Sequence, residues 1–296
     1  MRNDTGVRVT DGLAERQLAY SDEGKELDAV IPETTPDLAY YYDGTWEGWL
    51  CCVGESYLAK EIPGVIVPQT EEDGFVEENL FYTRTIVTRT DLARRVCNGI
   101  VARIGADFLQ ILQRVFCSCI PDKEAQMLLF THKGFRYGKQ ILHLRQDVVV
   151  KNVLKGLRDL GREVDKWWGF VRFSDVRGIL VAVIGAKNHV LPFIAPHFCD
   201  RYHNETFMIF DRNHRMALLY RPGKKAIVPM EEFAIGEVSE EEQRYRSLWK
   251  QYYDAIEIQP RHNETCRRTH MPKRYWDFLT EMTESEDCIS AYKELK

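Results

Sequence analysis

The sequence predicts an α+β protein whose helical N-terminal half packs on an antiparallel sheet with one inserted helix, followed by a helical C-terminus. Three observations support this fold class. Apolar residues recur at helical spacing between residues 46 and 57, and again between 91 and 168. Short apolar runs separated by turn residues fill 170 to 228, which is typical of strands joined by hairpins. Helical spacing returns after Ser239.

The domain organisation follows from composition. Residues 1–37 are polar and acidic, lack periodicity and end in IPETTPD, so they are predicted to form a flexible N-terminal extension. The chain has 296 residues with 44% apolar content, enough to bury a sizeable core. We expect one domain over 38–296, with a helical subdomain at 90–168, a sheet subdomain at 169–230 and C-terminal helices.

In the N-terminal half, residues 39–43 are predicted to form a short aromatic strand that turns at Asp43-Gly44 into a helix over 46–57. The acidic stretch 63–81 is predicted to be irregular, and the alternation at 83–88 predicts a strand. Three further helices are predicted: two are capped by Asp91 and Asp122, and the one between them begins at Asp107.

A long helix is predicted from Asp147 to Trp168, and its two faces differ. Apolar residues occupy one side. Five cations fall within about a quarter of the circumference on the other: Lys151, Lys155, Arg158, Arg162 and Lys166. Like charges at this spacing repel one another, and a bound polyanion would relieve that repulsion. The alternative is a solvated face that Asp159 and Asp165 partly neutralise.

The strand-rich block is predicted to contain strands at 170–173, 179–184, 206–210, 217–220 and 226–228, with the LPFIAPHF helix inserted after the second. Two helices are predicted to follow, one from the Ser239 cap through Tyr253 and one from Pro272 to about Met282.

A second basic segment, RHNETCRRTHMPKRYW, lies at 261–276. A proline at the first position of a helix would place Lys273 and Arg274 in the first turn, where the helix dipole disfavours cations unless an anion is bound there. A phosphate would satisfy both the amides and the side chains. The alternative is that these cations pair with acidic neighbours such as Asp277, Glu281 or residues 240–242.

Acid–base candidates lie at or near the ends of predicted elements, where sites are often built: Asp43, Glu47, Glu163, His197 and Asp211. A cap or structural partner is the favoured interpretation of each. No spacing matches a zinc site, although Cys199 and His203 lie one helical turn apart, so no metal is predicted. The sequence contains no phosphate-cradling glycine loop, serine elbow or Rossmann fingerprint, and no cofactor is expected.

The formal net charge of -5 does not favour general DNA coating, so any anion site must be a local patch. No apolar run is long enough to cross a membrane and the N-terminus is too charged for a signal peptide, which favours a cytoplasmic protein without a membrane partner. Eight scattered cysteines without a CxxC pair predict free, mostly buried thiols.

Four ordered motifs, YYDGTWEGWL at 41–50, GREVDKWWGFVRF at 161–173, LPFIAPHF at 191–198 and MPKRYW at 271–276, resemble an uncharacterised bacterial family associated with DNA repair or DNA metabolism. The resemblance covers residue 41 to the C-terminus. It implies a radical-SAM DNA repair protein as partner, because members of the family are encoded beside one, and some are fused to a uracil-DNA glycosylase-like domain. The family pattern has a histidine where this chain has Asp165. The positions that the resemblance implies are Asp43, Glu47, Arg162, Glu163, Arg172, His197, Lys273 and Arg274.

Together these features predict a DNA-binding accessory protein for a radical-SAM or uracil-DNA glycosylase-type partner. Two alternatives remain: a repair enzyme that hydrolyses a flipped base, with Asp211 or Glu163 activating water, and a scaffold that binds an acidic protein. Trp167, Tyr275 and Trp276 are candidate stacking surfaces. The predicted DNA contacts are Lys151, Lys155, Arg158, Arg162, Lys166, Arg172, Arg267, Arg268, Lys273, Arg274 and Tyr275.

Overall fold

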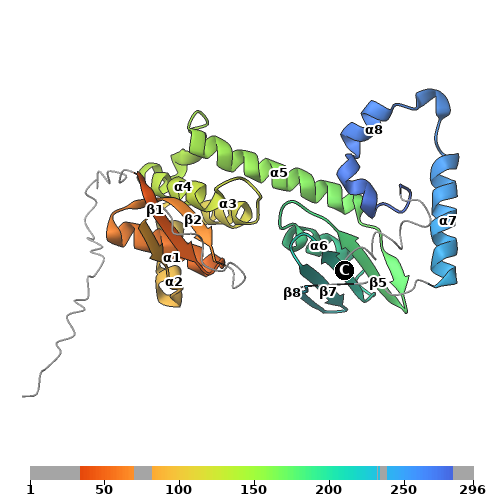
Figure 1. Ribbon diagram of the computed structural model, residues 1–296, viewed down its shortest axis with the longest axis horizontal. Helices are drawn as coiled ribbons and strands as arrows, with labels where there is room; N and C mark the ends of the chain where they lie inside the picture. Colours follow the sequence, from red (N-terminus) through yellow and green to blue (C-terminus); the bar gives the residue numbers. More distant parts are fainter. Residues whose placement is uncertain (1–33, 70–81, 232, 234–238, 283–296) are drawn as a thin grey trace, which may run out of the picture. The chain divides into compact units, whose positions relative to one another are not determined.

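A computed structural model describes residues 34–69, 82–231, 233 and 239–282 (Figure 1). The described residues form two hydrophobic cores, one in the N-terminal half and one in the C-terminal half. Most of the predicted N-terminal extension, residues 1–33, lies outside the described residues. Residues 34–37 of that predicted extension belong to the first strand.

The first core contains a parallel sheet that the sequence did not predict. Strand β1 (Thr34–Tyr42) lies between β2 (Ile62–Pro68) and β3 (Tyr82–Thr85), and both neighbours run parallel to it. Helix α1 (Trp46–Ala59) connects β1 to β2, as a parallel connection requires. The prediction of irregular chain at 63–81 was wrong for 63–68, because β2 is stabilised by β1, a partner distant in sequence. Residues 70–81 of that stretch lie outside the described residues.

Helices complete the first core: α2 (Thr90–Arg103), α3 (Ala106–Phe116), α4 (Lys123–Tyr137) and the 3-10 helix η1 (Gly138–His143). The predicted cap residues Asp91 and Asp122 form no side-chain cap. Arg89 precedes α2, and Asp122 precedes α4 in a left-handed conformation.

Helix α5 (Val148–Phe170) contributes to both cores. The Asp147 carboxylate accepts hydrogen bonds from the amides of Val149 and Val150 and so caps the helix, as predicted. The apolar residues of its first half pack in the first core, including Val150 and Val153. Those of its second half, including Leu160 and Trp167, pack in the second.

The second core is built on a five-stranded sheet in the order β4-β5-β6-β7-β8. Its strands are β4 (Ser174–Val176), β5 (Ile179–Ile184), β6 (Phe207–Asp211), β7 (Met216–Arg221) and β8 (Lys224–Pro229). The predicted purely antiparallel sheet needs one correction: β5 and β6 pair in parallel. Helix α6 (Leu191–Arg201) returns the chain between them, so the inserted helix makes a parallel connection.

The C-terminal region contains α7 (Glu240–Ala255), the 3-10 helix η2 (Gln259–Arg261), α8 (Glu264–His270) and the 3-10 helix η3 (Lys273–Phe278). Ser239 caps α7 as predicted. The helix predicted from Pro272 to about Met282 is only the short η3, so no long helix begins at Pro272. The strand predicted at 170–173 is also wrong, because α5 extends to Phe170 and β4 begins at Ser174.

Two further predictions concern the whole chain. Within the described ranges, no helix combines the length and the apolar content needed to cross a bilayer. The cysteines in the described part are free thiols: Cys51 and Cys52 are buried, whereas Cys119 and Cys266 are exposed.

Candidate functional site

The cationic face of α5 is exposed along most of its length. Lys151, Lys155, Arg158 and Arg162 are exposed, and the Arg162 side chain keeps 76% of its accessible surface, with one guanidinium nitrogen 3.8 Å from Asp159. Lys166 differs from the others, because its ammonium group donates to the carbonyl of His270 and lies over the Phe170 ring. Four of the five predicted cations therefore remain available on this face.

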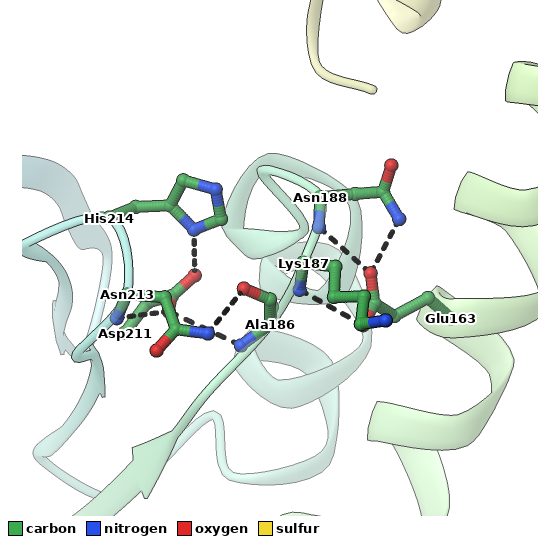
Figure 2. A network of polar contacts seen from close by, with 7 residues as sticks. All are labelled: Glu163, Ala186, Lys187, Asn188, Asp211, Asn213 and His214. Atoms are coloured by element: carbon green, nitrogen blue, oxygen red, sulfur yellow. Dashed lines mark hydrogen bonds and ion pairs between the residues drawn. The ribbon is translucent and has the colours of Figure 1, made fainter. Parts of the chain in front are cut away.

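The residue after Arg162 is a buried carboxylate. Glu163 is 2% exposed and accepts hydrogen bonds at both oxygens. Oε1 accepts from the Lys187 amide at 3.1 Å, and Oε2 accepts from the amide and the side chain of Asn188 at 2.9 and 2.5 Å (Figure 2). An Arg274 guanidinium nitrogen lies 3.1 Å from Oε1. Glu163 thus anchors the loop after β5 to α5, and its acceptor positions are occupied.

A second buried carboxylate holds the loop after β6. Asp211 is fully buried, and its Oδ1 accepts from the amides of Ala186 at 3.4 Å and Asn213 at 3.2 Å. The Asn213 side chain donates to the Ala186 carbonyl at 2.9 Å, which joins the two loops. Asp211 Oδ2 lies 2.7 Å from Nδ1 of His214, whose ring projects away from the loop (Figure 2).

Two histidine rings meet where these loops lie together. The centroids of His189 and His214 are 3.8 Å apart. The pKa of His189 is lowered to about 4, chiefly by burial and further by the charges of His214 and Lys123, although the residue keeps an exposed edge. The connection between α3 and α4 reaches the same place, because the Cys117 carbonyl accepts from the His189 amide and the Cys119 amide donates to Asn188.

The cations of the second basic segment mostly pair within the fold. Arg267 and Arg268 both pair with Glu264, and Arg274 pairs with Glu163. Lys273 is exposed and lies over the Trp276 ring. This arrangement resembles the predicted alternative, pairing with acidic groups, although the acidic partners differ from those named.

Two other predicted DNA contacts are integrated into the fold. Arg172 forms a bidentate pair with Glu281, at 3.2 and 2.7 Å. Tyr275 is 1% exposed and packs edge-on against the fully buried Trp167, at a centroid distance of 4.9 Å. The prediction that Tyr275 and Trp167 offer stacking surfaces was therefore wrong, because both rings belong to the second core.

Of the predicted acid–base residues, the structure connects Glu163 and Asp211 through residues 186–188. Asp43 instead accepts from Thr45 and Thr88 beside the first core. Glu47 is exposed. His197 stacks on Trp168, which projects from α5 about 140° around the axis from Glu163 at 100° per residue.

Sequence reasoning did not select the loop residues that surround the two carboxylates. A usable signal was present, because a cation-asparagine-histidine triplet follows each of two apolar strands: Lys187-Asn188-His189 after β5 and Arg212-Asn213-His214 after β6. Ligands of open sheets with parallel strands commonly bind beyond the carboxyl ends of those strands, which is where both triplets lie.

These features define a class: an α+β protein with two cores, a shared helix with a cationic face, and a polar cluster at the carboxyl ends of a parallel strand pair. The chain belongs to the family described as a domain of unknown function, DUF4130, whose model matches residues 121–281, more than half of the 296 residues. The matched region contains α5, the second sheet, Glu163 and Asp211, but neither Asp43 nor Glu47. A comparison with curated proteins found no match.

Proposed function

We propose that this protein binds DNA through the exposed cationic face of α5. The observation that carries the proposal is the row formed by Lys151, Lys155, Arg158 and Arg162 on a chain of net charge -5. The first three make no ion pair with any acidic residue that the structure describes. Their charge is therefore not neutralised by the described part of the protein.

The geometry of α5 suits a phosphate backbone. From Lys151 to Arg162 the helix rises about 16 Å, a length over which a nucleic-acid strand presents several phosphates. The opposite face packs in both cores, so these cations lie on a helix whose orientation is supported along its length. Binding would release counterions from the nucleic acid, and the affinity would fall steeply as salt is added.

The proposal is restricted to backbone contacts. Trp167 and Tyr275 are buried, so base stacking has little support from the aromatic residues of the predicted surface. The alternative of water activation by Glu163 or Asp211 is also weakly supported, because the oxygens of both carboxylates are occupied by donors within the fold. The radical-SAM or uracil-DNA glycosylase-type partner remains a prediction from the resemblance.

The test is fluorescence anisotropy with labelled single-stranded and duplex DNA across a salt series that begins near about 50 mM. The variant Lys151→Glu/Lys155→Glu/Arg158→Glu reverses three cations of the face. We expect it to bind at least about tenfold more weakly, and the slope of log affinity against log salt to fall in magnitude by about 3, since each lost phosphate contact reduces it by about 1.

The matched control is Arg94→Glu/Lys139→Glu/Lys224→Glu, which changes the net charge equally at exposed positions on other elements. Equal weakening in the control would show that net charge, rather than the α5 face, determines binding. Absence of DNA binding by the unaltered protein at low salt would overturn the proposal and favour the alternative of an acidic protein partner.

A further inference from the structure

We propose that the loops after β5 and β6, with the start of α4, form a binding site for a phosphate monoester, whose oxygens are met by His214, His189 and Lys123. This site is distinct from the cationic face of α5 and does not depend on DNA binding there. Its central feature is the juxtaposition of the two histidine rings beyond the carboxyl ends of parallel strands, at a centroid distance of 3.8 Å.

The carboxylate beneath the rings sets the orientation of His214. Asp211 is fully buried and accepts at 2.7 Å from Nδ1 of the imidazole, so the proton of the neutral ring is placed on Nδ1. Nε2 then faces away from the carboxylate, and no hydrogen bond to it is present among the described residues (Figure 2). In this neutral tautomer Nε2 is an acceptor, and it can donate to an anion only when the ring takes up a second proton.

The groups left free at this cluster favour an anion rather than a metal ion. The oxygens of Asp211 and Glu163 accept from amides and side chains of the fold, and no described group of three His, Cys, Asp or Glu residues could hold a metal. What remains is the imidazole of His214, the imidazole of His189 and the Lys123 ammonium group, which lies 3.7 Å from Glu124 and over the Phe116 ring. The Lys123 ammonium group bears donors, and each imidazole gains a further donor when it takes up a proton, so the cluster can become cationic toward a negatively charged ligand.

The charges around the rings support the same conclusion. Burial lowers the pKa of His189 to about 4, and the charges of Lys123 and of a protonated His214 further disfavour its protonation. Lys123 is balanced in part by Glu124, at 3.7 Å, and the neighbouring Arg212 lies 3.9 Å from Asp277. A dianion placed against the rings would relieve the repulsion and favour proton uptake by the histidine pair.

The cluster is also built from three separate segments of the chain. This is typical of a binding site, whereas a solvated loop consists of one segment. The connection before α4 bonds to the loop after β5 through Cys117 and Cys119, and Asn213 and Asp211 bond that loop to the loop after β6. The backbone around the histidines is therefore fixed by hydrogen bonds before any ligand binds, which reduces the entropic cost of binding.

The experiment is an NMR titration of the histidine ring resonances with deoxythymidine 5′-monophosphate at constant ionic strength, maintained with chloride. We expect saturable shifts of His189 and His214, and a rise of at least about one unit in the pKa of the pair when the ligand is bound. The exposed His203 and the buried His132 act as internal controls and should not shift. Absence of a saturable shift at His189 and His214, or an equal shift with chloride alone, would overturn the proposal.

Variants separate this site from the DNA surface. His214→Gln and Lys123→Gln should each weaken binding of the monophosphate at least about fivefold, whereas Lys151→Glu/Lys155→Glu/Arg158→Glu should leave it unchanged. Oligonucleotides with and without a 5′-phosphate distinguish a nucleic-acid end from a free ester: only a preference for the phosphorylated end would indicate the former. If His214→Gln fails to fold, the proposal is tested with Lys123→Gln alone. Unchanged binding of the monophosphate by Lys123→Gln would contradict the assigned contacts.

Discussion

The chain contains two parallel strand–helix–strand units, β1-α1-β2 and β5-α6-β6, whose strand ends differ in chemistry. After β1, Asp43 accepts from the Thr45 amide and from the hydroxyls of Thr45 and Thr88. Burial alone would raise the pKa of Asp43, but these hydrogen bonds outweigh it, so the pKa lies below its usual value. After β5 and β6, the buried carboxylates hold loops that carry cations and two histidines.

This difference shows that the same topology can close a strand end or leave side chains accessible at it. In the first unit, short neutral hydroxyl groups satisfy the carboxylate and close the turn. In the second unit, amides of the loops satisfy Glu163 and Asp211 from inside. The Lys187 side chain is therefore left exposed, and the partly buried His189 ring keeps an exposed edge. The second strand end therefore leaves side chains accessible, as the proposed phosphate site requires.

The largest expected effect comes from removing the anchor of the second unit. Glu163→Ala would leave the buried Asn188 and two loop amides without their acceptor and Arg274 without its partner. We expect a loss of about 3–5 kcal/mol in the free energy of unfolding, measured by urea denaturation.

The matched control is Glu47→Ala, which removes an exposed glutamate from the first turn of α1 and should change stability by no more than about 0.5 kcal/mol. A loss below about 1 kcal/mol in Glu163→Ala would contradict the role of Glu163 as the anchor of the loop after β5.

Acid titration compares His132, on α4 in the first core, with His189, in the loop after β5 of the second unit. His132 in the first core is 3% exposed, with Nε2 2.9 Å from the Ser56 hydroxyl, and burial lowers its pKa to about 4. Between about pH 6.5 and 4, His132 of the unfolded chain binds a proton that folded His132 does not bind. The stability that depends on neutral His132 is therefore fully present above about pH 6.5 and is lost as the pH falls toward 4. Over that window we expect His132 to account for about 3 kcal/mol.

The measurement is urea unfolding as a function of pH for the unaltered protein and for His132→Gln, in which this part of the pH dependence should disappear. Lys123→Gln sharpens the contrast, because it should raise the pKa of His189 and leave that of His132 unchanged. An unchanged pH dependence in His132→Gln would show that His132 does not titrate as a buried group.

The smallest expected effect concerns the closed turn after β1. A Cβ on Gly48 would lie 2.1 Å from Oδ1 of Asp43 and 2.8 Å from Oγ1 of Thr88, so Gly48→Ala must displace the groups that close the turn. We expect a loss of about 1–3 kcal/mol in thermal or urea unfolding.

The control for this substitution is Gly161→Ala in α5. A Cβ there meets no atom within 4 Å, so alanine should raise stability by about 0.5–1 kcal/mol through its better helix propensity. Equal effects of the two substitutions would show that the space around Asp43 is not closed.

Local signals predicted much of the helical structure. The Asp147 cap and the apolar spacing after it predicted α5, and the Ser239 cap predicted α7, since both depend on residues within one or two turns. Strand β2 could not be predicted in the same way. Its hydrogen-bond partner is β1, and nothing within the segment itself specifies that pairing.

The candidate site was likewise predicted only where it depends on spacing within one segment. Helical spacing was sufficient to place Lys151, Lys155, Arg158 and Arg162 on one face, but it could not show that Lys166 bonds to the His270 carbonyl. The burial of Tyr275 was also beyond prediction, because it depends on the docking of η3 against the second core.

The sequence by itself determined the α+β class, the position and length of α5, and the separation of its cationic and apolar faces, because these follow from capping and periodicity along a single segment. Only the tertiary structure decided that β5 and β6 run parallel and that Asp211 orients His214 beside His189. The two histidines are 25 positions apart in the chain. The physical reason is that such contacts depend on the crossover through α6, which brings distant strand ends to the same edge of a sheet.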